Sequence, residues 1–301
     1  MKAVLLTAYG DVDKLVVREV PDPKAGPNEI RVRLAGASIN PIDWKQRSGL
    51  AAQRMPLDLP AILGRDASGE VIEVGAGVTA FKVGDKVLGR VMGSYAEQVV
   101  APVDAWAKVP AKLDLADAAA LPLVLLTGAQ LVEEAVNLKR GDLVLVTGAL
   151  GGVGRTAVFA AKARGAKVYA GVRAKQRAEA AELGADVVVA LDDAGDVDKL
   201  PPLDAIADTV GGETTQMLLG KLKAGGAIGS VVGEPAGAKD RGFVVRAIMT
   251  RSDPRRLAEL AQAVADGKIV IPIARRFPLA QAAEAQKLAE AHVGGKVVLL
   301  A

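Results

Sequence analysis

The sequence predicts an α/β protein in which a small β domain is combined with a doubly wound parallel-sheet domain. Up to about residue 100, short apolar runs are separated by glycine and proline turns, a pattern typical of a small barrel or sandwich. From Asp114 onward, strand-like and helix-like runs alternate, which is typical of a parallel sheet covered by helices on both faces. The length of 301 residues also favours two domains.

The expected strands of the first part are apolar or alternating runs bounded by turn formers such as Gly10-Asp11 and Pro21-Asp22-Pro23. These strands are Met1–Thr7, Leu15–Val20, Glu29–Ala37, Ala67–Val74, Lys86–Leu88 and Tyr95–Ala101.

The rest of the chain is assigned from its change of hydrophobic period between strand-like and helix-like runs. Strands are expected at Leu143–Thr147, Lys167–Val172, Asp186–Ala190, Leu203–Asp208 and Ala227–Val232. Helices are expected at Leu115–Leu121, Gly128–Val136, Gly152–Arg164, Lys175–Leu183 and Glu213–Leu222. The C-terminal tail adds helices at Pro254–Asp266 and Leu279–Ala289 and strands at Ile269–Ile273 and Val297–Leu300.

The composition excludes several kinds of site. The chain has no cysteine, which excludes disulfides, thiolate zinc sites and a cysteine nucleophile. His292 is the only histidine, so a metal site built from several histidines is also excluded. A net charge of +3 and an aromatic content of 3% argue against a nucleic-acid partner.

Neither a targeting segment nor a membrane span is expected. Met1–Leu6 is too short to be a signal peptide. The uncharged stretch Ala118–Val132 is interrupted by Pro122 and Gly128 and falls short of the ~20 residues that span a bilayer. We therefore expect a cytoplasmic protein.

A glycine-rich loop follows the buried strand Leu143–Thr147 and precedes a helix, which is the context of a dinucleotide-binding loop. Gly151 and Gly152 would let the backbone approach a pyrophosphate, and Gly154 would permit close packing of helix on strand. Ala149 stands where the first glycine of the fingerprint is usual. The alternative is a tight turn without a ligand.

The end of the next strand indicates which nicotinamide cofactor is bound. NAD enzymes place an acid there, ~20 residues beyond the glycines, to bond the ribose. This chain has Arg173, followed by Lys175 and Arg177, and a guanidinium suits a 2′-phosphate. The sequence therefore favours NADPH, and the alternative is a solvated basic start of a helix.

Five short motifs occur in order along the chain. They are Asn40-Pro41-Ile42-Asp43-Trp44-Lys45, Gly64-Arg65-Asp66-Ala67-Ser68-Gly69, Gly93-Ser94-Tyr95-Ala96-Glu97, Asp208-Thr209-Val210-Gly211-Gly212 and Gly294-Gly295-Lys296-Val297-Val298-Leu299. With the glycine loop, they make the chain resemble the medium-chain dehydrogenase/reductase superfamily. Within it, the chain is similar to the zinc-lacking quinone oxidoreductase branch, which includes enone and alkenal reductases.

This resemblance implies a GroES-like β-barrel catalytic domain formed by residues 1–114 and 253–301, and a Rossmann domain at residues 115–252. It implies hydride transfer from NADPH to a small quinone or α,β-unsaturated carbonyl. Zinc-containing relatives carry Gly-His-Glu where this chain has Gly64-Arg65-Asp66, so no catalytic zinc is expected. The alternatives are an enoyl-thioester reductase and a non-catalytic NADPH-binding protein, structural or RNA-associated.

The resemblance also assigns cofactor contacts. Thr127 and Val153 match the positions that hold the nicotinamide ring, and Val210, Val232 and Gly233 match turns that meet the cofactor. For Thr127 the alternative is a helix-interior threonine that bonds back to a carbonyl. For Val232 and Gly233 it is packing at the end of a strand.

Three polar residues are candidates for catalysis. Asn40 could bond a carboxamide or a substrate carbonyl, Lys45 could stabilise an enolate, and Tyr95 could donate to a carbonyl. The alternatives are a turn former, a solvated lysine and a strand tyrosine that bonds the backbone. Asp43 and Asp66 are expected to form structural ion pairs with Arg65 or Lys45.

The segment Gly242–Ile248 contains the apolar run Phe243-Val244-Val245. Such a run at the edge of a sheet seeks a partner strand. We therefore expect a homodimer joined through this edge, as the resemblance also implies.

Overall fold

The computed structural model describes all 301 residues and divides into two compact units. One, called here the β unit, contains Met1–Leu123, Ser252–Gly267 and Ile271–Ala301. The other, the α/β unit, contains Val124–Arg251 and Lys268–Val270. Their architectures confirm the predicted fold class, a GroES-like domain and a Rossmann-like parallel sheet. The expected limits at 114/115 and 252/253 remain a proposal, whereas the compact units divide at 123/124 and 251/252.

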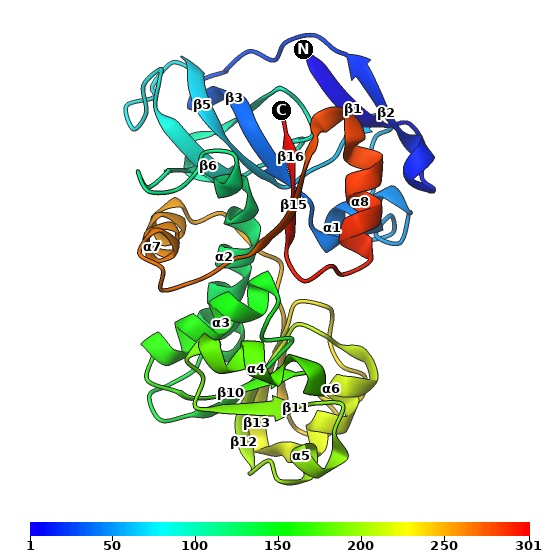
Figure 1. The fold of residues 1–301 in the computed structure, drawn as a ribbon, viewed down its shortest axis with the longest axis vertical. Coiled ribbons are helices and arrows are strands. Elements are labelled where there is room, and N and C mark those ends of the chain that lie inside the picture. Colours follow the sequence, from blue (N-terminus) through cyan, green and yellow to red (C-terminus); the bar gives the residue numbers. More distant parts are fainter. The chain divides into compact units, whose positions relative to one another are not determined.

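The β unit contains a three-stranded sheet with the order β2-β1-β4 and a larger sheet with the order β15-β16-β3-β5-β6-β8, in which β7 also pairs with β3. The strands are β1 Lys2–Leu6, β2 Leu15–Glu19, β3 Glu29–Ser38, β4 Ala61–Ile62, β5 Asp66–Val74, β6 Lys86–Arg90, β7 Gln98–Pro102, β8 Trp106–Lys108, β15 Ile273–Pro278 and β16 Lys296–Leu300. The last strand lies antiparallel to β3, so the C-terminal segment completes a sheet begun by the N-terminal strands (Figure 1).

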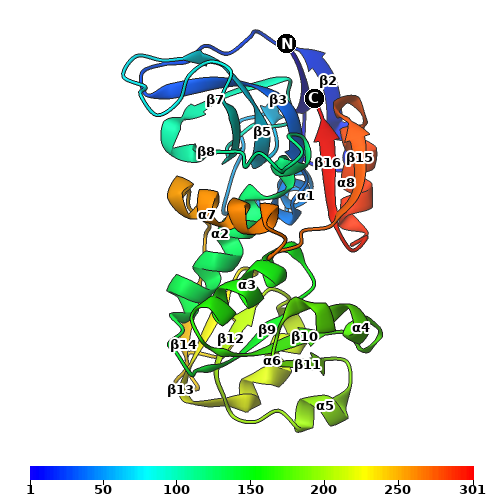
Figure 2. The ribbon, with the colours of Figure 1, turned by 60° about the vertical axis from the view of Figure 1, so that its left-hand side comes forward.

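Three helices belong to this unit: α1 Pro41–Arg47, α7 Pro254–Ala265 and α8 Ala282–Glu290. Helix α8 packs beside β16, where its apolar face covers buried strand residues that include Val297 and Leu299 (Figures 1 and 2). A second apolar cluster lies within the larger sheet, around Ile30, Val87 and Trp106.

The α/β unit is built on a six-stranded, fully parallel sheet with the order β11-β10-β9-β12-β13-β14. In order along the chain this is 3-2-1-4-5-6, the Rossmann order, and it reverses between β9 and β12. The strands are β9 Leu143–Thr147, β10 Lys167–Val172, β11 Val187–Ala190, β12 Leu203–Asp208, β13 Leu222–Ser230 and β14 Val244–Ala247. In such sheets ligands bind outside the carboxyl ends of the strands at this reversal.

Helices cover both faces of this sheet (Figure 2). They are α3 Gly152–Ala163, α4 Arg177–Ala180, α5 Ala194–Asp198, α6 Gly212–Leu218 and the π-helical turn Leu131–Val136, which continues helix α2 Pro122–Gln130. Val144 and Val146 pack into the cluster on one face, whereas Leu145 packs into the cluster on the other. The continuous apolar run of β9 is therefore explained by burial on both sides.

The helix around Thr127 differs from the prediction. It begins at Pro122 rather than Gly128, because proline lacks only an N–H that the first turn does not use. The helical run Asp117–Val136 has 20 residues, so it is longer than the uncharged stretch Ala118–Val132 that was considered from the sequence. By length and composition it could cross a membrane, but it is 83% buried inside the structure, as the core helix of a soluble protein is.

Two predicted strands were also misplaced. The segment Ile269–Ile273 is irregular, and strand β15 begins only at Ile273. Ile269 and Ile271 are buried, so their alternation reflects side-chain burial without a ladder of backbone hydrogen bonds. The strand expected from Tyr95 begins at Gln98.

Gly154 supplies a test of the packing that fixes this sheet. A Cβ there would lie 2.2 Å from the carbonyl oxygen of Gly148, whereas a Cβ at Gly220 would meet no heavy atom within 4 Å. We expect Gly154→Ala to lower the free energy of unfolding by about 1–3 kcal/mol. The control Gly220→Ala should leave it unchanged or slightly raised. Urea unfolding compares the two, and equal midpoints would contradict the packing argument.

Candidate functional site

The loop between β9 and α3 has an open backbone at its tip. Gly148 has a φ of +62°, and a Cβ there would lie 2.5 Å from Oγ1 of Thr209, so only glycine fits. Gly151 is exposed, and a Cβ on it would meet only the Gly148 carbonyl oxygen, at 3.3 Å. No side chain caps the first turn of α3. Its N–H groups are therefore available to an anionic ligand such as a pyrophosphate.

The other loop residues have packing roles. A Cβ at Gly152 would lie 2.9 Å from Cγ1 of Val124, so this glycine lets α2 and α3 approach each other. Any residue larger than glycine at position 152 would therefore collide with helix α2. Ala149 is fully buried and its N–H donates to the Gly171 carbonyl, while Val153 packs partly buried against the core. Gly154 brings α3 close to the turn after β9, since a Cβ there would collide with Gly148 and Ala149.

Asp208 joins the ends of three strands. Its Oδ1 accepts hydrogen bonds from the hydroxyls of Thr147 and Thr215, both at 2.8 Å, and from the N–H of Gly211 at 3.0 Å. Its Oδ2 accepts from the Ser230 hydroxyl at 3.1 Å. The buried carboxylate thus fixes the carboxyl ends of β9, β12 and β13 around the start of α6. From the sequence, Asp208 was part of the motif Asp208-Thr209-Val210-Gly211-Gly212, but this role at the strand ends was not predicted.

A pocket of about 270 Å³ lies beside this carboxylate. It is lined by Asp208, Gly211, Gly212, Thr215, Gln216, Val232, Gly233, Glu234, Pro235 and Ala236. Two predicted cofactor residues, Val232 and Gly233, therefore share one cavity at the carboxyl ends of β12 and β13. Val232 is 43% exposed, and Val210, in the turn after β12, is 48% exposed.

Thr127 is buried in helix α2, and its hydroxyl lies 2.6 Å from the hydroxyl of Thr250. No hydrogen bond runs from it back to a helix carbonyl, so the structural alternative named above is not the one observed. One hydroxyl of such a pair donates and the other accepts. The pair keeps one hydroxyl proton free for a further acceptor.

The basic residues after β10 differ in their availability. Arg173 and Lys175 are exposed, and neither side chain has a hydrogen bond or ion pair within the chain. Arg177 pairs with Asp196, which leaves it less free to bind an anion. Asp192 also approaches this turn, because its Oδ1 accepts from the Ala174 N–H at 2.7 Å. Arg173 and Lys175 are therefore the candidates for a 2′-phosphate.

In the β unit, both polar atoms of the Asn40 side chain form internal hydrogen bonds. Its amide nitrogen donates to Oδ2 of Asp66 at 2.8 Å and to the Ser38 carbonyl at 3.4 Å. Its Oδ1 accepts from Nζ of Lys296 at 2.6 Å. Neither amide atom of Asn40 is therefore left without a partner for the predicted contact with cofactor or substrate. The buried side chain instead links Asp66 to Lys296.

Asp66 is paired with Lys296 and not with Arg65 or Lys45, so the predicted partners were wrong. Its Oδ2 lies 3.8 Å from Nζ of Lys296, and its Oδ1 accepts from the Leu123 N–H at 2.7 Å. Burial raises the pKa of Asp66 and lowers the pKa of Lys296, and the opposite charge of each partner counteracts both shifts.

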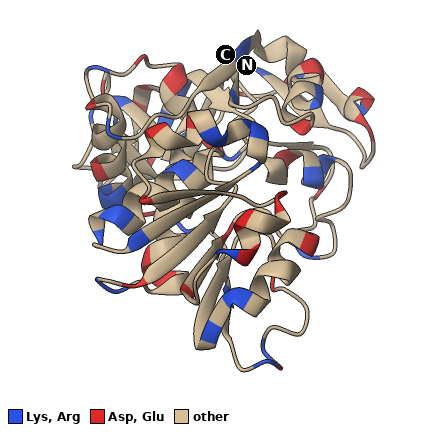
Figure 3. Cartoon of the chain, turned by 60° about the horizontal axis from the view of Figure 1, so that its bottom comes forward, with Lys and Arg blue, Asp and Glu red and all other residues tan.

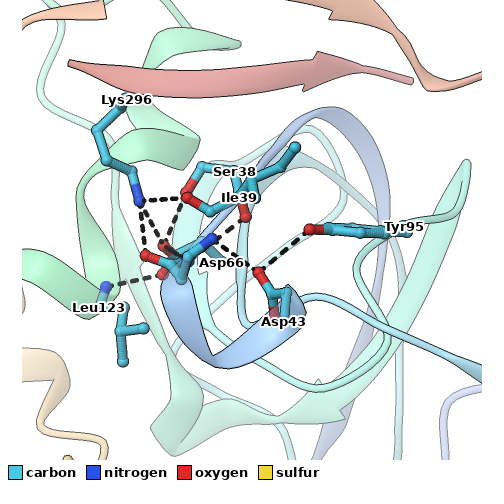
Figure 4. A network of polar contacts seen from close by, with 8 residues as sticks. Ser38, Ile39, Asp43, Asp66, Tyr95, Leu123 and Lys296 are labelled. Carbon is cyan, nitrogen blue, oxygen red and sulfur yellow. Dashed lines mark hydrogen bonds and ion pairs between the residues drawn. The ribbon is translucent and has the colours of Figure 1, made fainter. Parts of the chain in front are cut away.

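Tyr95 and Asp43 form the inner end of the same network (Figure 4). The Tyr95 hydroxyl donates to Oδ2 of Asp43 at 3.1 Å, and the Asn40 N–H donates to the same oxygen at 2.8 Å. Both side chains are fully buried. Burial raises the pKa of Asp43 to about 7 and the pKa of Tyr95 well above 10. Tyr95 was proposed as a donor to substrate, but the structure makes it a positioning residue for Asp43.

Lys45 is the one catalytic candidate whose polar group forms no hydrogen bond within the chain. Its Nζ lies 5.5 Å from the centroid of the Trp44 ring, and it makes no ion pair with Asp43. No group of three or more His, Cys, Asp or Glu side chains that could hold a metal ion is present.

The raised pKa of Asp43 predicts a pH-dependent stability. Between its ordinary pKa of 3.8 and about 7, the folded chain holds a proton that the unfolded chain has lost. The contribution of Asp43 to the free energy of unfolding therefore falls as pH rises from about 3.8 to about 7 and stays constant above that. We expect Asp43→Asn to remove this fall, so that the variant gains stability relative to the parent as pH rises from 5 to 7. Urea unfolding at several pH values measures this, and parallel curves would contradict it.

Two family models match the chain, one in each half. The alcohol dehydrogenase GroES-like domain matches residues 26–111. The zinc-binding dehydrogenase domain matches residues 183–299.

Relatives of known name span most of the chain. A quinone oxidoreductase from Pseudomonas aeruginosa is 33% identical over 328 residues, with 99% of both chains covered. A 2-haloacrylate reductase from a Burkholderia species is 30% identical over 322 residues, which cover 98% of this chain and 96% of the relative. The chain spans 60% of a chloroplastic quinone-oxidoreductase homolog from Spinacia oleracea and 55% of one from Arabidopsis thaliana.

A solved structure agrees with these matches. The quinone oxidoreductase from Coxiella burnetii has a TM-score of 0.91 and 34% identity, with 100% of this chain and 99% of that chain covered. The domain matches, the full-length relatives and the parallel sheet with its open glycine loop lead to one conclusion. The chain belongs to the medium-chain dehydrogenase/reductase superfamily, in its quinone oxidoreductase-like branch.

Proposed function

We propose that this chain transfers a hydride from NADPH to a quinone or an α,β-unsaturated carbonyl compound, without zinc. The observation that carries the proposal is the uncapped start of α3 behind the exposed Gly151, at the reversal of the Rossmann sheet. This backbone suits a pyrophosphate. Bound there, NADPH would supply the hydride and would become NADP⁺, whose nicotinamide ring carries the positive charge.

The residues present fit NADPH at three places. Arg173 and Lys175 would meet the 2′-phosphate, since both are exposed and unpaired after β10. Gly151, with the first turn of α3, would hold the pyrophosphate. The pocket at Val232 and Gly233 would receive the nicotinamide end, because it lies at the carboxyl ends of β12 and β13.

The composition supports a substrate that accepts hydride without a Lewis acid. A chain with no cysteine and one histidine lacks the usual zinc ligands, and zinc is what polarises the carbonyl in metal-dependent relatives. Quinones and conjugated carbonyls are electron-poor already. The full-length relatives named for a quinone and for 2-haloacrylate support this class. Lys45 would stabilise the negative charge that develops on oxygen.

We also propose that the chain is a cytoplasmic homodimer. Strand β14 is the edge of the six-stranded sheet, and its Val244 is exposed, which suits pairing with a second copy. Lys, Arg, Asp and Glu are interspersed along the elements seen in Figure 3. This distribution and the net charge of +3 give no support to an RNA partner.

Steady-state oxidation of NADPH tests the proposed function directly. We expect turnover with 1,4-benzoquinone and with a small enone, measured at 340 nm, and no loss of rate after chelation. Turnover confined to an enoyl thioester would favour the thioester reductase instead. Binding of NADPH without turnover of any acceptor would indicate the non-catalytic alternative.

Arg173 tests the choice of cofactor. We expect Arg173→Glu to weaken NADPH by about tenfold or more and NADH little, because the lost charge-assisted contact involves the 2′-phosphate alone. Fluorescence titration gives both dissociation constants. Arg54→Glu is the matched control, since it makes the same charge change on an exposed residue of the β unit. Equal affinity of the parent protein for NADPH and NADH would refute the proposal.

A further inference from the structure

An arginine of helix α3 binds the backbone of the glycine loop that precedes the helix. Nε of Arg155 donates to the Leu150 carbonyl at 2.9 Å, and the Arg155 N–H donates to the Gly151 carbonyl at 2.8 Å. The Gly151 N–H in turn donates to the Gly148 carbonyl at 2.9 Å. The peptide between Leu150 and Gly151 is therefore held at both its C=O and its N–H, and Arg155 holds the C=O.

The guanidinium group of Arg155 also binds a carboxylate on the next helix. Its Nη2 donates to Oε1 of Glu179, in α4, and the two side chains form an ion pair. The Arg155 side chain is only 10% exposed, whereas that of Glu179 is 54% exposed. Because a guanidinium presents its donors in a rigid planar fork, binding a carbonyl and a carboxylate together fixes its orientation. Arg155 thus connects the glycine loop to the helix that follows Arg173 and Lys175.

Both acceptors that Arg155 binds would oppose an anion at this loop. The Glu179 carboxylate would repel a phosphate, and a carbonyl oxygen carries partial negative charge of its own. The N–H groups of Gly152, Val153 and Gly154 precede the first helical hydrogen bond of α3, so they are the donors that an anion would use. Arg155 therefore leaves the donors free and occupies the acceptors.

We propose that Arg155 is a positioning residue for the cofactor pyrophosphate. It holds the Leu150–Gly151 peptide and neutralises Glu179, so that the free N–H groups at the start of α3 bind the anion. The inference rests on the proposed function, because it concerns the dinucleotide that would bind this loop. The effect of Arg155 is the same for NADPH and NADH, since both carry a pyrophosphate, whereas Arg173 would act on NADPH alone.

The chain offers a matched control on the same helix. Arg155→Gln removes the charge and the forked donor. Arg164→Gln makes the same change at the other end of α3, where Nε of Arg164 donates to the Leu138 carbonyl at 2.8 Å. Arg155→Lys keeps the charge and loses the planar fork. The probes are NADPH, NADH and adenosine 2′-monophosphate, which carries the 2′-phosphate but no pyrophosphate.

We expect Arg155→Gln to raise the dissociation constants of NADPH and NADH by about tenfold each, and that of adenosine 2′-monophosphate by less than about twofold. Arg164→Gln should change none of the three by more than about twofold, and Arg155→Lys should still bind both dinucleotides about threefold more weakly than the parent. Fluorescence titration measures the dinucleotides, and ligand-observed NMR measures the mononucleotide.

An equal loss of affinity for adenosine 2′-monophosphate would overturn the proposal, because Arg155 would then support the fold of the unit as a whole. Full dinucleotide affinity in Arg155→Lys would also overturn it, since any cation would then suffice. Unchanged dinucleotide affinity in Arg155→Gln would remove this inference and leave the proposed function. The expected binding pattern without turnover of any acceptor would remove the proposed catalysis and support this inference, and a parent protein that binds no dinucleotide would remove both.

Discussion

The buried bond between Lys296 and Asn40 is the contact on which the β unit depends. It joins residues 256 positions apart, because β16 lies against β3 and β3 lies against β5. Through Asn40 the lysine reaches Asp66, and through the Asn40 N–H it reaches Asp43. Removing one charge of the buried Lys296–Asp66 pair in this network would cost about 3–5 kcal/mol, because the remaining charge stays buried. The C-terminal strand and the loop before α1 are therefore held by one network.

Asp208 has the corresponding role in the α/β unit. Three parallel strands end at its carboxylate, and the turn into α6 donates backbone N–H groups to it. Parallel strands have no hairpin to align their ends, so a buried acceptor at the carboxyl edge fixes the register of the turns. The pocket at Val232 and Gly233 depends on those turns. Both units thus use a buried carboxylate to place loops rather than to react.

Local patterns predicted much of this structure. Five strands of the parallel sheet were located because each is a short apolar run between turn residues, and the glycine loop could be placed by its neighbours. The sixth strand, β14, was expected only as the edge segment Gly242–Ile248. The partners of Asp66 could not, because Lys296 arrives through strand pairing across the whole chain. The roles of Gly151 and Gly152 also needed coordinates. Adjacent glycines look alike in sequence, but only Gly152 faces Val124.

At the position where zinc-containing relatives carry a histidine, this chain carries Arg65. Arg65 places a fixed cation there, which can bond an anion but cannot supply a metal-bound water or an open coordination position. The nearby titratable groups, Asp43 and Tyr95, are fully buried and bonded to each other, so they hold the framework. If the proposed function holds, rate acceleration would come mainly from holding hydride donor and acceptor in line, which supplies ~7–11 kcal/mol in well-oriented systems. Such a mechanism demands a rigid framework more than a reactive side chain, and the buried carboxylates of Asp66 and Asp208, each bonded through both oxygens, provide that rigidity.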